Sequence, residues 1–304
     1  MPFTHRPYAG ESDYGKMRDL LIQAYALNGP PDYCSVGELD WWRWGPGGAS
    51  GKTELVELWW DEQNKLAGMA WPDATWGSDV TLDLLIHPAY PEVIDAMLTW
   101  AEKHQRLAKG EAPLQLSTWA FTSDQKRTTL LRLHNYAPGQ KAYMFMGRDL
   151  AGELPAPPLP SGYAIRHVQG EADFPERVEV HRDAFAPSRL TVDIYRKLAA
   201  EAPTYHPELD LVVVAPDDTF AAYCLVWFDA VNKIGVFEPV GCYSAHRRKG
   251  LTKAVMVEGL RRLQTLGATR AFVNTLRGEP AANTLYKSVG FERVDDSEQW
   301  KKVI

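Results

Sequence analysis

Apolar and polar residues follow two different periods along the second half of the chain. Apolar runs at 211–215, 221–227 and 233–242 predict three strands, and the stretch RAFVNT, residues 270–275, predicts a fourth. Between the third and fourth strands, apolar residues recur at helical spacing, and a short helix is predicted at 281–289. The apolar positions of the longer helix are Leu251, Val255, Met256, Leu260 and Leu263. Strands and helices in this order predict an α+β or α/β fold, a sheet covered by helices.

The first half of the chain resembles the second half. THRPYAGESDY, residues 4–14, matches AIRHVQGEADF, residues 164–174, and weaker similarity continues toward the end of each half. A proline-rich stretch, Ala151–Gly162, lies between the two and is typical of an extended linker. Repeats this long indicate a duplicated domain rather than a solenoid. We therefore predict one domain at 1–150, a linker at 151–162 and a second domain at 163–304.

The composition is that of an ordinary globular protein, with 45% hydrophobic and 24% charged residues among 304. A net charge of −6 and a pI near 5.8 argue against nucleic acid or an anionic membrane as a partner. The start, MPFTHRPYAG, does not have the pattern of a signal peptide, and no apolar run has membrane-spanning length, so we expect a cytoplasmic protein. We expect the chain to be a monomer or a homodimer. Three widely spaced cysteines, Cys34, Cys224 and Cys242, suggest neither a disulfide framework nor a metal site, and we expect buried thiols.

A basic run, His246–Lys249, stands directly before Gly250 and the longer helix. The first N–H groups of a helix lack intrahelical acceptors, and the helix dipole adds about half a positive charge at that end. Gly250 would let the backbone approach a ligand closely, and Arg247, Arg248 and Lys249 would add charge-assisted hydrogen bonds. The turn therefore has the chemistry of a pyrophosphate site, with a solvated charged loop as the alternative.

Two segments of the second half resemble the GNAT acetyltransferase superfamily. VGCYSAHRRKGLTKAV resembles its acyl-CoA-binding motif, with Arg247 and Gly250 in the expected places and Thr252 where the family prefers glycine or alanine. NTLRGEPAANTLYKSVGFE resembles its last conserved segment, in which the matching residues are Asn283, Tyr286, Gly290 and Phe291. The resemblance implies a tandem GNAT-type protein, in which each domain has a mixed, mainly antiparallel sheet flanked by helices. It also implies that residues 163–304 bind acetyl-CoA and that residues 1–150 are a degenerate copy.

The resemblance further implies a role for each residue of the site. Tyr286 would protonate the leaving thiolate, with a core tyrosine as the alternative, and Glu238 would be the general base, with an ordinary exposed carboxylate as the alternative. Asp229 is a second candidate for the base. Pro239 fits a bulge where the family's long strand is kinked. The residues that the resemblance assigns to acetyl-CoA are Val240, Cys242, Arg247, Arg248, Lys249, Gly250, Leu251, Thr252 and Asn283. For Asn283, a helix N-cap is the alternative.

Together these motifs predict an N-acetyltransferase that moves an acetyl group from acetyl-CoA to a primary amine, on a small molecule or at a peptide N-terminus. A non-catalytic acyl-CoA-binding or scaffolding protein is the alternative, because Thr252 departs from the motif and the base is not fixed. A hydrolase has little support, since the sequence contains neither a Gly-x-Ser-x-Gly elbow nor an HExxH pair. No metal is expected.

The first half lacks the residues on which this chemistry depends. In place of the basic turn it has Pro91 and Ile94, and a branched side chain there should exclude a phosphate. Leu131 replaces the tyrosine and has no proton to donate. Asn135 replaces the glycine that ends the last helix, and asparagine is the residue that best tolerates positive φ after glycine. We therefore expect the first half to keep the fold and to have lost the chemistry.

Two other stretches of the first half invite a functional interpretation. GGASGKT, Gly47–Thr53, is not a P-loop, because Pro46 stands where the motif needs glycine and a strand rather than a helix follows. Trp41, Trp42 and Trp44 come after the first helix, where GNAT proteins build substrate walls. Packing between the two halves is the alternative for these tryptophans.

Overall fold

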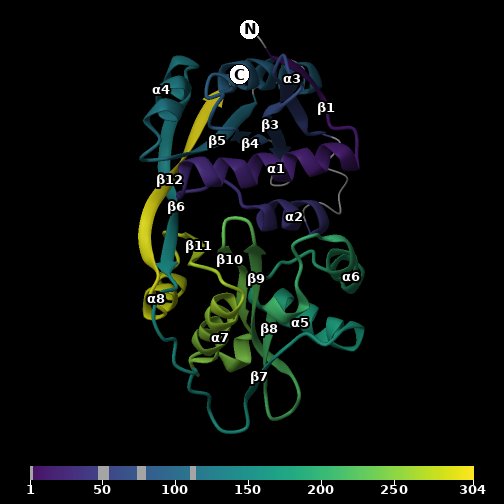
Figure 1. Cartoon of the computed structure of the whole chain (residues 1–304), viewed down its shortest axis with the longest axis vertical. Coiled ribbons are helices and arrows are strands. Elements are labelled where there is room, and N and C mark those ends of the chain that lie inside the picture. Colours follow the sequence, from purple (N-terminus) through teal and green to yellow (C-terminus); the bar gives the residue numbers. More distant parts are fainter. Residues whose placement is uncertain (1–2, 47–54, 74–79, 110–113) are drawn as a thin grey trace. The chain divides into compact units, whose positions relative to one another are not determined.

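The chain forms two compact units that interleave its two halves. The computed structural model describes residues 3–46, 55–73, 80–109 and 114–304 (Figure 1). Unit 1 comprises Met1–Cys34, Gly51–Met144 and Val294–Ile304, and unit 2 comprises Ser35–Ser50 and Phe145–Arg293. The units are defined by contacts, whereas the predicted domains are defined by repeated sequence, so the division at the proline-rich linker stays a prediction.

Unit 1 is a mixed sheet with helices packed on it. Its elements are β1 (Thr4–Pro7), α1 (Glu11–Asn28), β2 (Glu57–Trp60), β3 (Leu66–Asp73), β4 (Val80–Ile86), α3 (Val93–Lys109), β5 (Gln115–Phe121), α4 (Gln125–Leu133), the first part of β6 (Ala137–Asp149) and most of β12 (Glu292–Val303). The strands lie in the order β1-β2-β3-β4-β5-β12-β6, and Figure 1 shows teal β6 and yellow β12 side by side. β4 and β5 are parallel, while β1–β2, β2–β3, β3–β4 and β5–β12 are antiparallel. Apolar side chains of β3, β4, β5 and α3 form the core together with Trp59 and Trp300.

Unit 2 likewise consists of mixed parallel and antiparallel strands with helices packed on them. Its elements are α2 (Val36–Trp44), the end of β6, β7 (Ala164–His167), α5 (Phe174–Ala184), α6 (Val192–Glu201), β8 (Asp210–Val214), β9 (Phe220–Asp229), β10 (Ile234–Cys242), α7 (Leu251–Thr265), β11 (Arg270–Leu276) and α8 (Pro280–Ser288). The strands lie in the order β6-β11-β10-β9-β8-β7. β10 and β11 are parallel, and β7–β8, β8–β9 and β9–β10 are antiparallel. The strands and helices predicted for this half are present within a few residues of the predicted bounds, and the predicted fold class is confirmed.

The two units share one local structure at the first strand of each copy. In unit 1, Arg6 donates to the Asp13 carboxylate through both terminal nitrogens, at 2.6 and 2.8 Å. In unit 2, Arg166 does the same with Asp173, at 2.5 and 2.9 Å. In both units the carboxylate also accepts a backbone N–H from the preceding turn, and both sheets contain one parallel strand pair. The duplication predicted from the sequence is therefore present in the structure.

Helix α2 comes from the first half of the sequence but packs in unit 2, against β9 and α6. Its N-terminus is a capping box, in which the Ser35 hydroxyl accepts the Glu38 N–H at 3.2 Å and the Glu38 carboxylate accepts the Ser35 N–H at 2.7 Å. One turn further on, the buried Asp40 carboxylate accepts the Thr204 N–H at 2.9 Å. These bonds fix both the start of the helix and its contact with the rest of unit 2.

Two of the three tryptophans singled out in the sequence pack inside unit 2. The Trp44 indole is buried and donates to the Glu201 carboxylate at 3.0 Å, and the Trp41 ring lies 5.9 Å from the His181 ring on α5. A role for these rings as substrate walls stays a prediction. The stretch Gly47–Thr53, which resembles a P-loop, lies outside the described residues.

The cysteines are free thiols. Cys34 and Cys224 are buried, as predicted, and Cys242 is half-buried. In the part of the chain that the structure describes, none of the helices has both the length and the apolar character needed to cross a membrane.

Gly37 is the position where α2 lies tightest on the sheet. A Cβ added to Gly37 would lie 2.1 Å from the Trp227 Cβ. We expect Gly37→Ala to lower the free energy of unfolding by about 1–3 kcal/mol, because an overpacked contact forces its surroundings to shift. Gly15, in α1, has nothing within 4 Å of such a Cβ, so Gly15→Ala should be neutral or stabilise by about 0.4–1 kcal/mol. Urea unfolding of both variants measures the difference, and equal stabilities would contradict the packing of α2 on Trp227.

Candidate active site

The two parallel strands of unit 2, β10 and β11, stop pairing with each other partway along their length. The register of β10 with β11 ends where Val236 lies opposite Phe272, although both strands continue. On its other edge, the register of β10 with β9 shifts between Phe237 and Val240, so the bulge predicted at Pro239 is confirmed. In this part of the described sheet, the backbone of β10 beyond Val236 has no ladder partner on β11. Its polar groups need other partners, and a ligand can supply them.

The basic turn connects β10 to α7 and is exposed at Arg247, Arg248, Lys249 and Gly250. Gly250 has a φ of 77° and Arg248 a φ of 64°, both in the left-handed region. The first backbone hydrogen bond of α7 runs from the Ala254 N–H to the Gly250 carbonyl at 3.0 Å, so the three N–H groups between them precede the helical ladder. A Cβ at Gly250 would have no atom within 4 Å. Exposed cations, a helix N-terminus and open space at a glycine have the chemistry of a site for a phosphate or pyrophosphate group.

A tyrosine outside the motif holds this turn in place. The Tyr163 hydroxyl lies 3.1 Å from His246 Nδ1 and accepts a hydrogen bond from the Lys249 ammonium at 3.0 Å. At the start of the turn, the Ser244 hydroxyl donates to Asp183 of α5 at 2.9 Å. Lys249 is therefore positioned by the protein itself. The sequence motif contains no signal for Tyr163, because it lies far away along the chain, just before β7.

Glu238 lies close enough to Tyr286 to affect the pKa of the tyrosine. Glu238 Oε2 is buried and has no hydrogen-bond partner among the described residues. Burial, and then the nearby Glu38 carboxylate, raise the pKa of Glu238 to about 8. Tyr286 is 8% exposed, and burial, followed by the charges of Glu238 and Cys224, raises the pKa of Tyr286 to about 12. At neutral pH the site thus holds a protonated phenol near a carboxyl group that can take up or release a proton.

The structure adds Glu38 and Asn274 to the predicted site. Glu38, on α2, lies close enough to Glu238 to raise its pKa, and Glu38 Oε1 accepts a long hydrogen bond of 3.5 Å from Asn274 Nδ2 on β11. Burial raises the pKa of Glu38, while hydrogen bonds from Ser35 and Asn274 act in the opposite direction. In the sequence, Ser35 and Glu38 signal a capping box. A capping box does not say which sheet its helix packs on, so sequence reasoning missed this carboxylate.

The predicted cofactor residues on β10 and at the start of α7 differ in how far their side chains are exposed. Val240 and Cys242 are half-buried on the part of β10 that follows the bulge. Burial raises the pKa of the Cys242 thiol, and a hydrogen bond from Thr252 acts against this. Thr252, the departure from the motif, therefore contacts the end of β10. Leu251 is 1% exposed, so its backbone is what it offers to a ligand.

Asn283 and Asp229 are engaged in turns. Asn283 Oδ1 accepts the Thr275 hydroxyl at 3.1 Å and Asn283 Nδ2 donates to the Arg277 carbonyl at 3.2 Å, which holds the connection from β11 to α8. The N-cap of α8 is Glu279, so the N-cap alternative for Asn283 is wrong, and its contact with pantetheine stays a prediction. Asp229 accepts three hydrogen bonds of 2.7 to 3.0 Å inside the β9–β10 turn, at the far end of β10 from the bulge. These bonds favour Glu238 over Asp229 as the base.

Unit 1 differs from unit 2 at the corresponding places. Ile94 is 1% exposed and Leu131 is fully buried, and both belong to the hydrophobic core. Asn135 has a φ of 61°, which is the left-handed conformation expected of an asparagine in the place of Gly290, whose φ is 81°. The fold of unit 1 is therefore kept by substitutions that remove the polar groups of the site.

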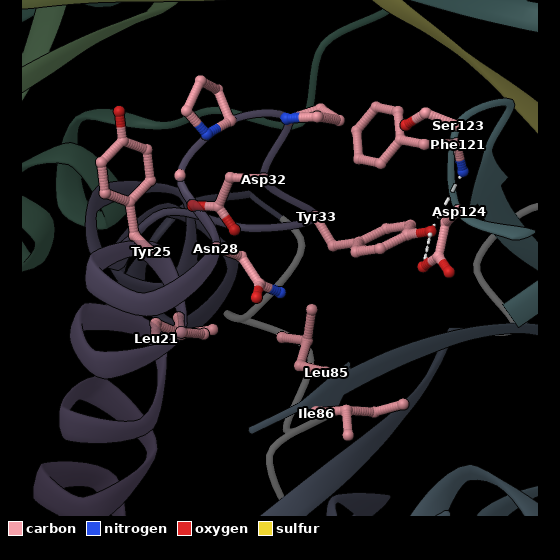
Figure 2. A pocket seen from close by; sticks show the side chains of 14 residues that line it. Leu21, Tyr25, Asn28, Asp32, Tyr33, Leu85, Ile86, Phe121, Ser123 and Asp124 are labelled. Carbon is pink, nitrogen blue, oxygen red and sulfur yellow. Dashed lines mark hydrogen bonds between the residues drawn. The ribbon is translucent and has the colours of Figure 1, made fainter. Parts of the chain in front are cut away.

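Unit 1 has a pocket of about 190 Å³ between the end of α1, the loop after it and the ends of β4 and β5 (Figure 2). The Tyr33 hydroxyl donates to the Asp124 carboxylate and accepts the Phe121 N–H, each at 3.0 Å, and Figure 2 shows Asn28 and Asp32 on the same side of the cavity. Among the described residues, the side chains that line this pocket include no Lys or Arg. The pocket therefore lacks the cations of a pyrophosphate site.

Unit 2 therefore has a sheet with a splayed parallel pair and a basic turn before the following helix, as the resemblance of its two motifs predicts. Residues 175–291 match the model of the Acetyltransferase (GNAT) family, so unit 2 carries a GNAT domain, and the family predicted from the two motifs is confirmed. The match covers the C-terminal part of the chain, which agrees with a first copy that has lost the motifs.

The chain is also similar to a curated protein in sequence and to solved structures in fold. The chain is 24% identical over 240 residues to the mycothiol acetyltransferase of Pseudarthrobacter chlorophenolicus, a match that covers 70% of this chain and 67% of that protein. A GCN5-related N-acetyltransferase from Sphaerobacter thermophilus aligns with a TM-score of 0.67 at 18% identity, over 99% of this chain and 96% of that one. A tandem GNAT protein from the clavulanic acid biosynthesis pathway gives a TM-score of 0.67 at 14% identity, over 99% and 98%. At these identities the structural likenesses show the fold, including its tandem form.

The raised pKa of Glu238 should make the protein less stable as the pH rises. A glutamate in the unfolded chain has a pKa of 4.5, against about 8 in the folded chain, so between these values the folded chain binds more protons than the unfolded chain. We expect the free energy of unfolding of the wild type to fall across this range relative to that of Glu238→Gln, which cannot ionise. Urea unfolding at several values from about pH 5 to about pH 8 measures both chains, and parallel profiles would contradict the raised pKa.

Proposed function

We propose that unit 2 transfers an acetyl group from acetyl-CoA to the primary amine of a small-molecule acceptor. The observation that carries this proposal is the splayed strand that leads into the basic turn, with the Glu238 carboxyl oxygen and the Tyr286 side chain buried and close enough to interact electrostatically. The family match and the mycothiol acetyltransferase relative support acetyl transfer in general. The donor and the acceptor are our inference. A peptide N-terminus would present the same amine on a larger acceptor.

The basic turn would bind the pyrophosphate of acetyl-CoA. The N–H groups that precede the α7 ladder are preorganised donors, and Arg247, Arg248 and Lys249 add charge. Acetyl-CoA, when bound, supplies an activated acetyl group. A backbone N–H near Cys242, at the end of β10, would stabilise negative charge on the acetyl oxygen, an oxyanion contact that the family resemblance implies.

Glu238 and Tyr286 supply the proton transfers. A carboxylate with a pKa of about 8 can take a proton from an acceptor ammonium, which frees the nitrogen lone pair to form the new N–C bond. Tyr286, with a pKa of about 12, stays protonated at neutral pH and can give its proton to the sulfur as the C–S bond breaks. The nitrogen then loses a second proton, which restores the Tyr286 phenol, and Glu238 releases its proton to water. The products are an acetamide, a free thiol and one proton in solution.

A non-catalytic acyl-CoA-binding protein is the second candidate. The observation that favours it is Thr252, which replaces the family's glycine or alanine and contacts Cys242 at the end of the splayed strand. Such a protein would use the same turn and would not need Glu238 or Tyr286.

Calorimetric titration with acetyl-CoA tests the turn. We expect one site per chain in the wild type and at least a tenfold weaker site in Gly250→Val, because a branched side chain would enter the open space and strain a φ of 77°. Gly267→Val is the matched control, since Gly267 lies at the other end of α7 with a φ of 83° and equally open surroundings. Equal loss of binding in both variants would trace the effect to strain in α7 rather than to the phosphate contact. Two equivalents per chain would contradict an inert first half.

Tyr286→Phe separates the enzyme from the binding protein. For the enzyme we expect kcat to fall by about 10²–10⁴, because the general acid is lost, while the Kd for acetyl-CoA stays unchanged. Tyr90→Phe, in unit 1, is the control and should leave both quantities unchanged. Thiol release from acetyl-CoA in the presence of putrescine, glucosamine or an alanyl peptide measures turnover. Unchanged turnover in Tyr286→Phe would remove this residue from the mechanism.

A further inference from the structure

The first half of the sequence supplies a second carboxylate to the active site of unit 2. Glu38 stands in the first turn of α2, where its Oε2 accepts the Ser35 N–H at 2.7 Å and its Oε1 reaches the Asn274 amide. Because both carboxylate oxygens are engaged by fixed neighbours, the side chain is held in one orientation. Glu38 therefore both starts a helix and holds its carboxylate at a fixed place beside β11.

One contact ties the start of α2 to the backbone of Glu238. Gly37, the residue before Glu38, packs directly on the side chain of Trp227. The Trp227 indole in turn donates a hydrogen bond of 2.7 Å to the Glu238 carbonyl oxygen. A single tryptophan thus connects the helix that carries one carboxylate with the strand that carries the other.

A second connection comes from the neighbouring strand. The last paired position of the parallel register is Val236 opposite Phe272, and Glu238 and Asn274 each follow it by two residues on their own strand. Residues two apart point to the same face of a strand, which places both side chains on one face. The Asn274 amide holds Glu38 by a hydrogen bond. Glu38 and Glu238 are therefore brought together from two sides.

We propose that Glu38 is a positioning residue for Glu238: it keeps a like charge beside the base, so that the pair receives acceptors that arrive as ammonium ions. The inference rests on the proposed function, because it concerns the acceptor side of the same site. It adds a residue from the degenerate half, which accounts for the packing of α2 in unit 2.

The charges around Glu238 support this role. Two carboxylates in a desolvated place repel each other, and each favours protonation of the other, so Glu238 holds a proton more tightly than a lone carboxylate would. A base works best when its pKa lies near the working pH and near that of the proton donor. An arriving ammonium relieves the repulsion, whereas a neutral nucleophile does not. Among the described residues, the Glu38 carboxylate on α2 acts on Glu238, and Glu238 in turn acts on Tyr286 of α8. The neighbouring elements β9 and α5, which pack on β10, carry further titratable groups, among them Tyr223, Cys224, Arg177 and His181.

The test is the titration of Glu238 in the free chain. Carboxyl signals of a chain labelled with δ-13C-glutamate are followed by NMR, and the Glu238 signal is identified by its loss in Glu238→Gln. In Glu38→Gln, which keeps the hydrogen-bonding shape but not the charge, we expect the midpoint of Glu238 to fall by about one unit. Ser35→Ala is the control, because it breaks the capping box and keeps the carboxylate, so the midpoint should stay where it is in the wild type.

Kinetics provide the second readout. For whichever of putrescine, glucosamine or an alanyl peptide the wild type acetylates, the acidic limb of the kcat/KM profile should move down by about the same amount in Glu38→Gln and stay in place in Ser35→Ala. A Glu238 midpoint that does not move in Glu38→Gln, or that moves equally in Ser35→Ala, overturns the role of Glu38. If the wild type acetylates none of the amines, the proposed function fails, and the NMR titration still decides whether Glu38 sets the proton affinity of Glu238.

Discussion

The active site depends on the point where β10 stops pairing with β11. A strand inside a sheet normally uses its backbone N–H and C=O groups in hydrogen bonds to both neighbouring strands, which leaves none for a ligand. Here the bulge between Phe237 and Val240 lets β10 stay bonded to β9 on one edge while it leaves β11 on the other. Pro239 suits this place because it has no N–H to lose. Glu238, the proposed base, lies at the same break with a carboxyl oxygen buried, so one irregularity both frees the strand and sets the position of this side chain.

The comparison of the two units shows how little separates a site from its degenerate copy. Both units keep the arginine–aspartate pair at the first strand of each copy and one parallel strand pair, which are properties of the fold. Unit 1 lacks the glycine at the start of the helix and the tyrosine on the last helix. The residues that replace them, Ile94 and Leu131, are buried in its hydrophobic core. Apolar residues in those places do not lower the stability of the fold, because burial of an apolar side chain is favourable wherever the backbone allows it.

Local patterns in the sequence predicted the features that depend on local chemistry. The strands and helices of the second half, the basic turn with its glycine, the bulge at Pro239 and the left-handed Asn135 each follow from residues next to one another in the chain. The interleaving of the halves could not be predicted this way. Ser35 and Glu38 specify that a helix begins, yet the sheet that receives the helix is chosen by Gly37 against Trp227, almost two hundred residues away. The same reason hides Tyr163 and Asn274, whose partners lie far away along the chain.

The site separates two electrostatic tasks along one strand. In the proposed function, the turn after Cys242 would offer exposed cations to a phosphate, and the break at Glu238 would offer two carboxylates to an ammonium. The net charge of −6 reflects neither task alone. Exposed charges interact through water and are screened by salt over about 8–10 Å, whereas desolvated charges a few residues away are screened far less. Binding of the donor should therefore respond mainly to ionic strength, and transfer to the acceptor mainly to pH. The splayed strand keeps the two apart, because the exposed turn lies beyond its end and the carboxylate pair lies within the sheet, under α2.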